Sequence, residues 1–339
     1  MEMKIGIIGA GSWGTAVGVL LSKSGHNVYI WDRDKELVEQ IINAKENLKY
    51  LPGILFPASL KGCQSNEEAV KDADVVIMAV PSQAVRSACQ GLKEYIEEKQ
   101  IIVSLAKGIE MGTYKTPSSI IEEYFPCNKV CVISGPSHAE EVSRDIPTAV
   151  VCASKSQQAA EEIQDLFISP KFRVYTNPDV IGVEIGGAVK NIIALGAGIS
   201  DGLGFGDNTK SALMTRGIAE ISRLGEAMGA EQQTFSGLSG IGDLIVTCTS
   251  MHSRNRRAGI LIGQGKSVEE ALKEIRMVVE GVNTTKSTFE LAQRLNIEMP
   301  ITSQLYKVLF QGKSPLYAVS ELMLRDKKHE IEEVVHKMW

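Results

Sequence analysis

Hydrophobic and polar positions in the first half of the chain alternate between short β-branched runs and longer segments with helical spacing. A buried parallel strand reads as a short continuous apolar run, whereas an amphipathic helix repeats its apolar positions every three to four residues. The strand-like runs are 3–8, 26–31, 75–80, 101–105, 130–134, 149–153 and 172–175. The helical segments between most of them include 15–24, 83–98, 117–124 and 157–167. This alternation predicts a parallel, doubly wound α/β sheet with its ligand at the carboxyl ends of the strands.

The pattern changes near residue 180. β-branched runs become scarce, and helical spacing dominates in 211–228, 268–275, 287–294 and 303–310. We therefore expect an α/β domain over residues 1–179 and an all-helical, substrate-binding domain over residues 180–339. No low-complexity linker joins them, so they should pack directly and leave a cleft, which is a common place for a ligand.

The composition is that of a globular protein of two domains, with 339 residues, 44% hydrophobic and 23% charged. A net charge of −5 gives no sign of nucleic-acid binding. Residues 1–24 lack the basic start and the small-residue cleavage site of a signal peptide. Apolar windows such as 192–199 are too short and glycine-rich to span a bilayer. We expect a cytoplasmic, enzyme-like protein that binds neither nucleic acid nor membrane.

The six cysteines are spread along the chain, and only Cys127 and Cys131 lie close together. No second pair or nearby histidine completes a zinc set, and the five histidines include no H-E-x-x-H. We expect reduced cysteines, most of them in the core, and no metal site.

The most informative segment follows the first strand-like run. Gly9, Gly11 and Gly14 form G-x-G-x-x-G between a strand and a helix, with Ser12 and Trp13 inside the turn. In this context the first glycine allows a tight turn, the second lets a pyrophosphate approach the backbone, and the third lets the helix pack on the strand. The positive end of the helix then favours phosphates. These residues predict that the α/β domain is a dinucleotide-binding domain of Rossmann type.

The second strand-like run ends in Asp32 and Arg33, about 20 residues after the turn, where the adenosine ribose should lie. An acid at this place can accept the ribose 2′-OH of NAD, and an arginine can pair with the 2′-phosphate of NADP. Both are also ordinary charges after a strand. The pair leaves the choice between NAD and NADP open.

Other strand ends should meet the same ligand. Lys107 follows the run 101–105, so its side chain should point into the crevice. Its positive charge could there bind a phosphate or an oxygen atom. The alternative is an ordinary surface lysine. Gly135 and Ser137 follow the run 130–134 and open a short helix whose N–H groups suit a small anionic or hydroxylated ligand. Simple helix capping would explain Ser137 but not the glycine.

In the second half, Lys190 stands beside Asn191 in an apolar run, shortly after Gly186 and Gly187. Partial burial would lower the pKa of this lysine toward a value useful in general acid–base catalysis. The alternative is a helix-surface lysine whose charged end reaches solvent.

Two later segments add polar groups. A glycine-rich loop leads into a helix at Asp243. Ser253, Arg254 and Asn255 then bring a hydroxyl, a guanidinium fork and an amide, a set suited to a phosphate, unless they only begin a solvated basic helix. Glu280 precedes a glycine. It is placed to bind an amide or ribose of the cofactor, unless it is only the first residue of a helix.

The motifs, in chain order, are GAGSWGTA, VPS, AKGIE, SGPSHAEEV, GVEIGGAVKNIIALGAGISDGLGFGDN, GLSGIGDLIVTC, SRNRRAG and VVEGV. Together they resemble the bacterial soluble NAD(P)-dependent glycerol-3-phosphate dehydrogenases over nearly the whole chain. The resemblance implies reversible reduction of dihydroxyacetone phosphate to sn-glycerol 3-phosphate, the backbone of glycerophospholipids. It also implies NAD or NADP as the cofactor and a homodimer as the assembly.

The resemblance implies roles for single residues as well. Lys190 matches the catalytic lysine and would donate the proton. With the glycine turn, the expected cofactor contacts are Gly9, Gly11, Ser12, Trp13, Gly14, Arg33, Tyr50, Lys107, Ala139, Arg254, Val278 and Glu280. The implied substrate contacts are Lys107, Gly135, Ser137, Lys190, Asp243, Ser253, Arg254 and Asn255.

Two other classes of protein share part of this pattern. The β-hydroxyacid dehydrogenases also join a dinucleotide domain to a helical domain, but they resemble G-x-x-x-K-x-x-x-N, and here Ala194 stands four residues after Lys190. Their substrate carries a carboxylate instead of a phosphate. A dinucleotide-sensing protein without turnover is the second alternative, and the intact Lys107, Lys190 and Asp243 argue against it.

Overall fold

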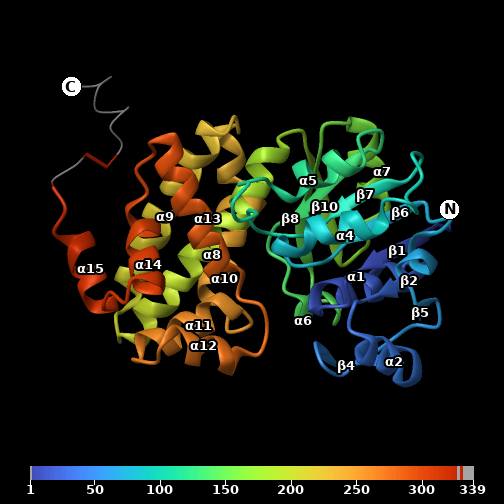
Figure 1. Cartoon of the computed structure of the whole chain (residues 1–339), viewed down its shortest axis with the longest axis horizontal. Coiled ribbons are helices and arrows are strands. Elements are labelled where there is room, and N and C mark those ends of the chain that lie inside the picture. The colour runs from blue at the N-terminus through green and yellow to red at the C-terminus, as the bar shows by residue number, and fades with distance from the viewer. Residues whose placement is uncertain (1, 327–328, 331–339) are drawn as a thin grey trace.

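The computed structural model describes residues 2–326 and 329–330. In this part of the chain the strands form an eight-stranded sheet, in the order β10-β9-β8-β7-β6-β1-β2-β5, and a separate β3-β4 pair. The strands are β1 Lys4–Ile8, β2 Asn27–Trp31, β3 Glu46–Asn47, β4 Leu51–Leu55, β5 Leu60–Gly62, β6 Val75–Met78, β7 Ile101–Ser104, β8 Val130–Ser134, β9 Thr148–Ser154 and β10 Phe172–Asn177. Figure 1 shows this sheet on one side of the molecule and a purely helical part on the other.

The helices divide in the same way. Those of the sheet-containing part are α1 Ser12–Lys23, α2 Lys35–Ala44, α3 Asn66–Val70, α4 Val85–Leu92, α5 Pro117–Tyr124, α6 Ala139–Val142 and α7 Gln157–Phe167. Those of the helical part are α8 Val180–Gly202, α9 Asp207–Ala227, α10 Asp243–Thr249, α11 Arg254–Gly263, α12 Val268–Ile275, α13 Glu280–Leu295, α14 Pro300–Phe310 and α15 Pro315–Met323. The predicted combination of a Rossmann-type sheet with an all-helical second part is confirmed.

The expectation of a wholly parallel sheet is wrong at one pair of strands. β9 runs antiparallel to β8, and β10 follows β9 in parallel. The link from β8 to β9 contains only the four-residue helix α6. Such a helix rises only about 6 Å. The link therefore lacks the long helix that usually returns the chain to the other end of a sheet, and β9 starts where β8 stops and runs in the opposite direction.

Alternate residues of the central strands face two different hydrophobic layers. Ile77 and Val103 pack in one cluster with apolar residues of α1 and α7, whereas Val76 and Ile102 pack in another with α3, α4 and α5. Both faces of the sheet are therefore covered by helices. Strands buried on both faces are continuously apolar, which explains why the sequence pattern was readable here.

Helix α8 is the centre of the helical part, and α9, α10, α11 and α13 pack around it. We expected apolar windows such as 192–199 to be too short to span a bilayer, and for this helix that expectation is wrong. Residues 192–199 belong to a 23-residue helix with a mean hydropathy of 1.5, the one candidate span among the described residues. Of its most apolar window, 94% is buried inside the protein, so α8 is a core helix.

Helices α8 and α11 touch backbone to backbone. A Cβ atom on Gly198 would collide with the carbonyl oxygen of Arg256, and one on Gly259 would collide with the carbonyl oxygen of Leu195. Only glycine permits this approach. The contact brings the start of α11, with Arg254 and Asn255, close to the middle of α8.

Some elements begin, end or occur where the pattern did not indicate. The predicted helix over 83–98 is a 3₁₀ turn at Ser82–Ala84 followed by α4, which ends at Leu92. The predicted helix over 287–294 is longer and begins at Glu280. Helix α15 and the β3-β4 pair had no clear signal, because they are short and only partly apolar.

Candidate active site

A cavity of about 850 Å³ lies where the carboxyl ends of the central strands meet the helical part. It is lined by most of the residues that the sequence singled out. These are Gly9, Gly11, Ser12, Trp13, Arg33, Tyr50, Lys107, Ser137, Ala139, Lys190, Asp243, Ser253, Arg254, Asn255, Val278 and Glu280. Gly14 and Gly135 do not line it.

The glycine turn leaves its backbone open toward this cavity. Gly9 has a φ of +109°, and a Cβ there would lie 2.6 Å from the carbonyl oxygen of Ala79. A Cβ on Gly14 would collide with Gly9, so these two positions require glycine for packing. Nothing lies within 4 Å of the corresponding point at Gly11. Beside it, Nε1 of Trp13 is buried without a hydrogen-bond partner in the described chain. Open backbone and an unused donor fit a dinucleotide.

The two charges after β2 differ in their surroundings. The carboxylate of Asp32 accepts hydrogen bonds from the backbone N–H of Ala10 at 2.8 Å and of Asp34 at 3.0 Å. Arg33 is exposed at the rim of the cavity. Across the rim, the hydroxyl of Ser12 donates to the backbone carbonyl of Tyr50 at 2.8 Å. Asp32 therefore braces the glycine turn, and Arg33 stays available.

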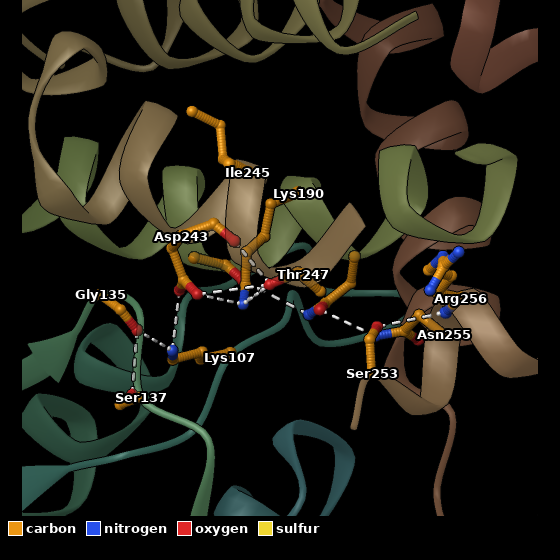
Figure 2. Close-up of polar contacts among 12 residues, drawn as sticks. Lys107, Gly135, Ser137, Lys190, Asp243, Ile245, Thr247, Ser253, Asn255 and Arg256 are labelled. Atoms are coloured by element: carbon orange, nitrogen blue, oxygen red, sulfur yellow. Dashed lines mark hydrogen bonds and ion pairs between the residues drawn. The ribbon is translucent and has the colours of Figure 1, made fainter. Parts of the chain in front are cut away.

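Two lysines share one carboxylate at the inner end of the cavity. Nζ of Lys190 lies 2.6 Å from Oδ1 of Asp243, and Nζ of Lys107 lies 2.8 Å from Oδ2 of the same side chain. Lys190 also donates to Oγ1 of Thr247 at 2.8 Å, and Lys107 donates to the carbonyl oxygen of Gly135 at 2.9 Å. Figure 2 shows these contacts converging on Asp243. The arrangement holds both ammonium groups at defined points facing the cavity.

Burial sets the acidity of this cluster. Lys190 is 5% exposed and Asp243 is 1% exposed. Burial lowers the pKa of Lys190 to about 8, with Asp243 raising it and Lys107 lowering it. Burial opposes ionisation of Asp243, but Lys107 and Lys190 together hold its pKa below the usual value. A lysine with such a pKa can both give and take a proton near neutral pH.

At the start of α11, the side chains of Ser253 and Asn255 already have hydrogen-bond partners within the protein, although a phosphate was expected to bind them. The hydroxyl of Ser253 accepts the N–H of Arg256 and caps the helix. The amide of Asn255 is engaged at both ends, donating to Oδ1 of Asn191 at 2.9 Å and accepting the N–H of Gly281 at 2.8 Å. Asn255 therefore links α11, α8 and α13, and the helix N-terminus faces the cavity as a site for an anion.

Arg254 and Glu280 stand beside each other at the domain junction. Burial lowers the pKa of Arg254, and the nearby Glu280 raises it. The carboxylate of Glu280 accepts the N–H of Ser82 at 3.0 Å and its hydroxyl at 2.7 Å. A Cβ on Gly108 would collide with that hydroxyl. Glu280 thus clamps the first turn of α13 onto the turn after β6.

Several cavity residues were not assigned from the sequence. Thr247 lies one turn after Asp243 on the same helix, so the i, i+4 spacing pointed to it. His138 packs its ring 5.7 Å from that of His252, and burial and the charge of Lys190 lower its pKa. Arg257 and Arg276 also line the cavity and had no distinguishing motif.

We also compared the positions of the side chains that commonly bind metal ions. Among residues 2–326 and 329–330, no group of three or more His, Cys, Asp or Glu side chains is placed to hold a metal ion. The six cysteines are free thiols, and all but Cys127 are buried.

A glycine turn and a buried lysine–carboxylate pair that face one cavity are the arrangement of a two-domain, dinucleotide-dependent dehydrogenase. The family models described as NAD-dependent glycerol-3-phosphate dehydrogenase N-terminus and C-terminus match residues 4–160 and 179–320. The chain therefore belongs to the NAD-dependent glycerol-3-phosphate dehydrogenase family.

Individual relatives agree with this assignment. A protein of Thermoanaerobacter sp. (strain X514) named NAD(P)+ glycerol-3-phosphate dehydrogenase is 59% identical over 97% of this chain and 99% of its own. One of the same name from Clostridium tetani is 57% identical, over 96% of this chain and 93% of its own. The crystal structure of glycerol-3-phosphate dehydrogenase from Coxiella burnetii superposes with a TM-score of 0.93 at 38% identity, covering 96% of this chain and 99% of that one.

Proposed function

We propose that this protein reduces dihydroxyacetone phosphate to sn-glycerol 3-phosphate, reversibly, with NADH or NADPH. The observation that carries the proposal is Lys190, buried at the inner end of a cavity that a dinucleotide turn also lines. The relatives' names support both the substrate and the open choice of cofactor. The product is the backbone of glycerophospholipids, so the reaction would supply their synthesis.

The cofactor would be held mainly by the sheet-containing part. Gly11, Trp13 and the N-terminus of α1 offer open backbone, an unused indole N–H and a positive helix end. Arg33 would contact the adenosine end of the cofactor, and Glu280 would contact it where the two parts meet. When bound, the reduced dinucleotide supplies the hydride that reaches the ketone carbon.

Lys190 would supply the proton. Asp243 and Thr247 hold its Nζ in place, so the ammonium group can stabilise the growing negative charge on the carbonyl oxygen and then donate to it. In the reverse direction the neutral amine accepts the proton from the hydroxyl group. Lys107 fixes the other oxygen of Asp243 and keeps that carboxylate ionised.

The substrate's phosphate would bind at the start of α11. The first N–H groups of that helix and the guanidinium of Arg254 suit a phosphate dianion. Ser137 lines the cavity from the sheet-containing part, and its hydroxyl donates to the carbonyl of Gly135 at 2.9 Å. Binding energy at the phosphate would position the ketone at Lys190.

The test is turnover of the purified chain, followed as the loss of reduced nicotinamide absorbance. Dihydroxyacetone phosphate should be reduced, and 3-oxo acids without phosphate should not. Lys190→Ala should lower kcat by about 10²–10⁴-fold and leave NADH affinity nearly unchanged, because a general acid is lost. Lys155→Ala, which removes an exposed lysine paired with Glu122, is the control. More than a tenth of wild-type kcat in Lys190→Ala would exclude this lysine as the proton donor.

We also propose residues 1–179 as the dinucleotide-binding unit and 180–339 as the substrate-binding unit. β10 ends at Asn177, and Asp179 caps α8 by accepting the N–H of Gly182. We further propose, from the family resemblance, a homodimer that acts in the cytoplasm. We propose no membrane attachment, because the long apolar helix α8 is buried inside the protein. Sedimentation and cell fractionation test the assembly and the location.

A further inference from the structure

The basic side chains that line the cavity fall into two groups. Lys107 and Lys190 share the carboxylate of Asp243. The arginines of the cavity make no side-chain hydrogen bond or ion pair to any other residue of 2–326 or 329–330, and they are Arg33, Arg254, Arg257 and Arg276. The cavity therefore holds four guanidinium groups that no side chain of the described residues binds directly.

Arg257 differs from the other cavity arginines in having a buried Nε–H without an acceptor among the described residues. Arg33 and Arg276 are exposed to solvent. Arg257 is only partly exposed, and its Nε–H is buried with no acceptor in the described chain. A buried donor on a charged group that lacks a partner is costly, and native structures almost always satisfy it. The missing acceptor points to a ligand.

The position of Arg257 on its helix makes the ligand an anion. Arg257 follows Arg254 by three residues on α11, so both side chains lie on the same face. Burial lowers the pKa of Arg254, and the charge of Arg257 lowers it further. Glu280 and Glu140 oppose this and raise the pKa of Arg254. Glu280 already accepts two hydrogen bonds from Ser82. An anion beside Arg257 would offset this repulsion and match the planar donor geometry of its guanidinium.

Two phosphate sources enter this cavity under the proposed function, and the structure favours one. The substrate's phosphate belongs at the first turn of α11, where Ser253 and the helix N-terminus lie. Arg257 lies about 4.5 Å further along the axis of α11 than Arg254. The other cavity residues of the helical part beyond α11 are Leu272, Arg276 and Met277, which lead into the cofactor-side residues Val278 and Glu280.

We infer that Arg257 binds the phosphates of the dinucleotide from the helical part, while the glycine turn binds them from the sheet-containing part. This inference rests on the proposed function only in assuming a dinucleotide ligand. It makes cofactor binding a contact that ties both parts of the molecule together. No acidic or hydroxyl side chain of the described chain competes for the guanidinium of Arg257.

Direct binding tests the inference without turnover. NADH and ADP-ribose are titrated against the full-length wild type, Arg257→Gln and Arg257→Lys. ADP-ribose carries the pyrophosphate without the nicotinamide. Arg257→Gln should raise Kd for both ligands by about tenfold or more, because charge-assisted hydrogen bonds are lost, and Arg257→Lys should restore part of the affinity. Arg173→Gln is the matched control, since Arg173 is exposed on β10 outside the cavity.

The substrate provides the second measurement. At saturating NADH, the KM for dihydroxyacetone phosphate should stay within about twofold in Arg257→Gln, because Ser253, Arg254 and Asn255 are unchanged. A raised KM for that substrate with unchanged ADP-ribose affinity would overturn the inference in favour of the substrate's phosphate. Unchanged values for both would overturn it as well. If the wild type binds ADP-ribose through Arg257 but never reduces dihydroxyacetone phosphate, the proposed function fails and the inference stands.

Discussion

The carboxylate of Asp32 accepts the backbone N–H of Ala10 at 2.8 Å, so the acid at the end of β2 is bonded to the glycine turn itself. Its other oxygen accepts the N–H of Asp34. An acid at this place was expected to choose between NAD and NADP. From this geometry we predict that Asp32 braces the turn for either cofactor and that discrimination falls to the neighbouring Arg33.

Replacing the brace should weaken both cofactors. Asp32→Ala leaves the N–H of Ala10 without its acceptor and loosens the turn that faces the pyrophosphate. We expect Kd for NADH and for NADPH to rise together by about tenfold, since hydrogen bonds to a charged group are among the stronger ones. Fluorescence titration of both cofactors measures this. Tighter binding of NADPH alone would show that Asp32 acts by repelling the 2′-phosphate.

Arg33 should matter for NADPH only. It is exposed at the rim of the cavity, and a guanidinium fork suits a phosphate. Arg33→Ala should raise KM for NADPH about tenfold and leave KM for NADH nearly unchanged, because NADH has no charge there. Initial rates with the two cofactors decide the matter. An equal loss with both would mean that Arg33 supports the fold or the shared adenosine.

The pH profile of the reaction should follow Lys190. In the proposed mechanism reduction uses the protonated amine of Lys190, so kcat for dihydroxyacetone phosphate should fall as pH rises through about 8. Asp243 raises the pKa of Lys190. Asp243→Asn removes that effect, so the fall should begin at lower pH, and kcat should drop at every pH. Asp145→Asn, on the exposed pair with Lys23, should keep the wild-type profile. If the alkaline limb of the kcat profile stays at the same pH in Asp243→Asn, Lys190 is not the proton donor.

Arg254 should recognise the phosphate of the substrate. Arg254→Ala should lower kcat/KM for dihydroxyacetone phosphate by about 10- to 100-fold and change that for unphosphorylated dihydroxyacetone much less. The ratio of the two values is the measurement. If the ratio stays at its wild-type value, the phosphate binds elsewhere.

The clamp between Ser82 and Glu280 should depend on Gly108. In Gly108→Ala the new methyl group collides with the hydroxyl of Ser82, and Oε2 of Glu280 lies 3.4 Å from it. Crowding of this kind costs about 1–3 kcal/mol in the free energy of unfolding. Thermal melting should show a lower Tm, with weaker NADH binding. Gly91→Ala, whose nearest neighbour is 3.6 Å away, is the control. Equal Tm values for Gly108→Ala and wild type would show that the clamp has room to shift.

Much of the fold could be predicted from the sequence, because the pattern of apolar residues within each strand reflects its burial. Strands β6, β7 and β8 are continuously apolar, since helices cover both faces of the sheet. The antiparallel turn into β9 was not readable, because strand direction depends on how far the intervening chain can travel. The buried length of α8 was also missed, because its glycines suggest a break, whereas α11 uses them for close packing.

For the site, the sequence by itself determined which side chains are available. Local spacing marks the glycine turn, the lysines at positions 107 and 190, and the cluster 253–255. Only the tertiary structure decided how they are used. It placed one carboxylate, Asp243, between two lysines, turned Asp32 toward the backbone, engaged both ends of the Asn255 amide, and left Nε of Arg257 without an acceptor. The physical reason is that pKa values and hydrogen-bond partners depend on burial and on neighbours far away in the chain, which no local pattern records.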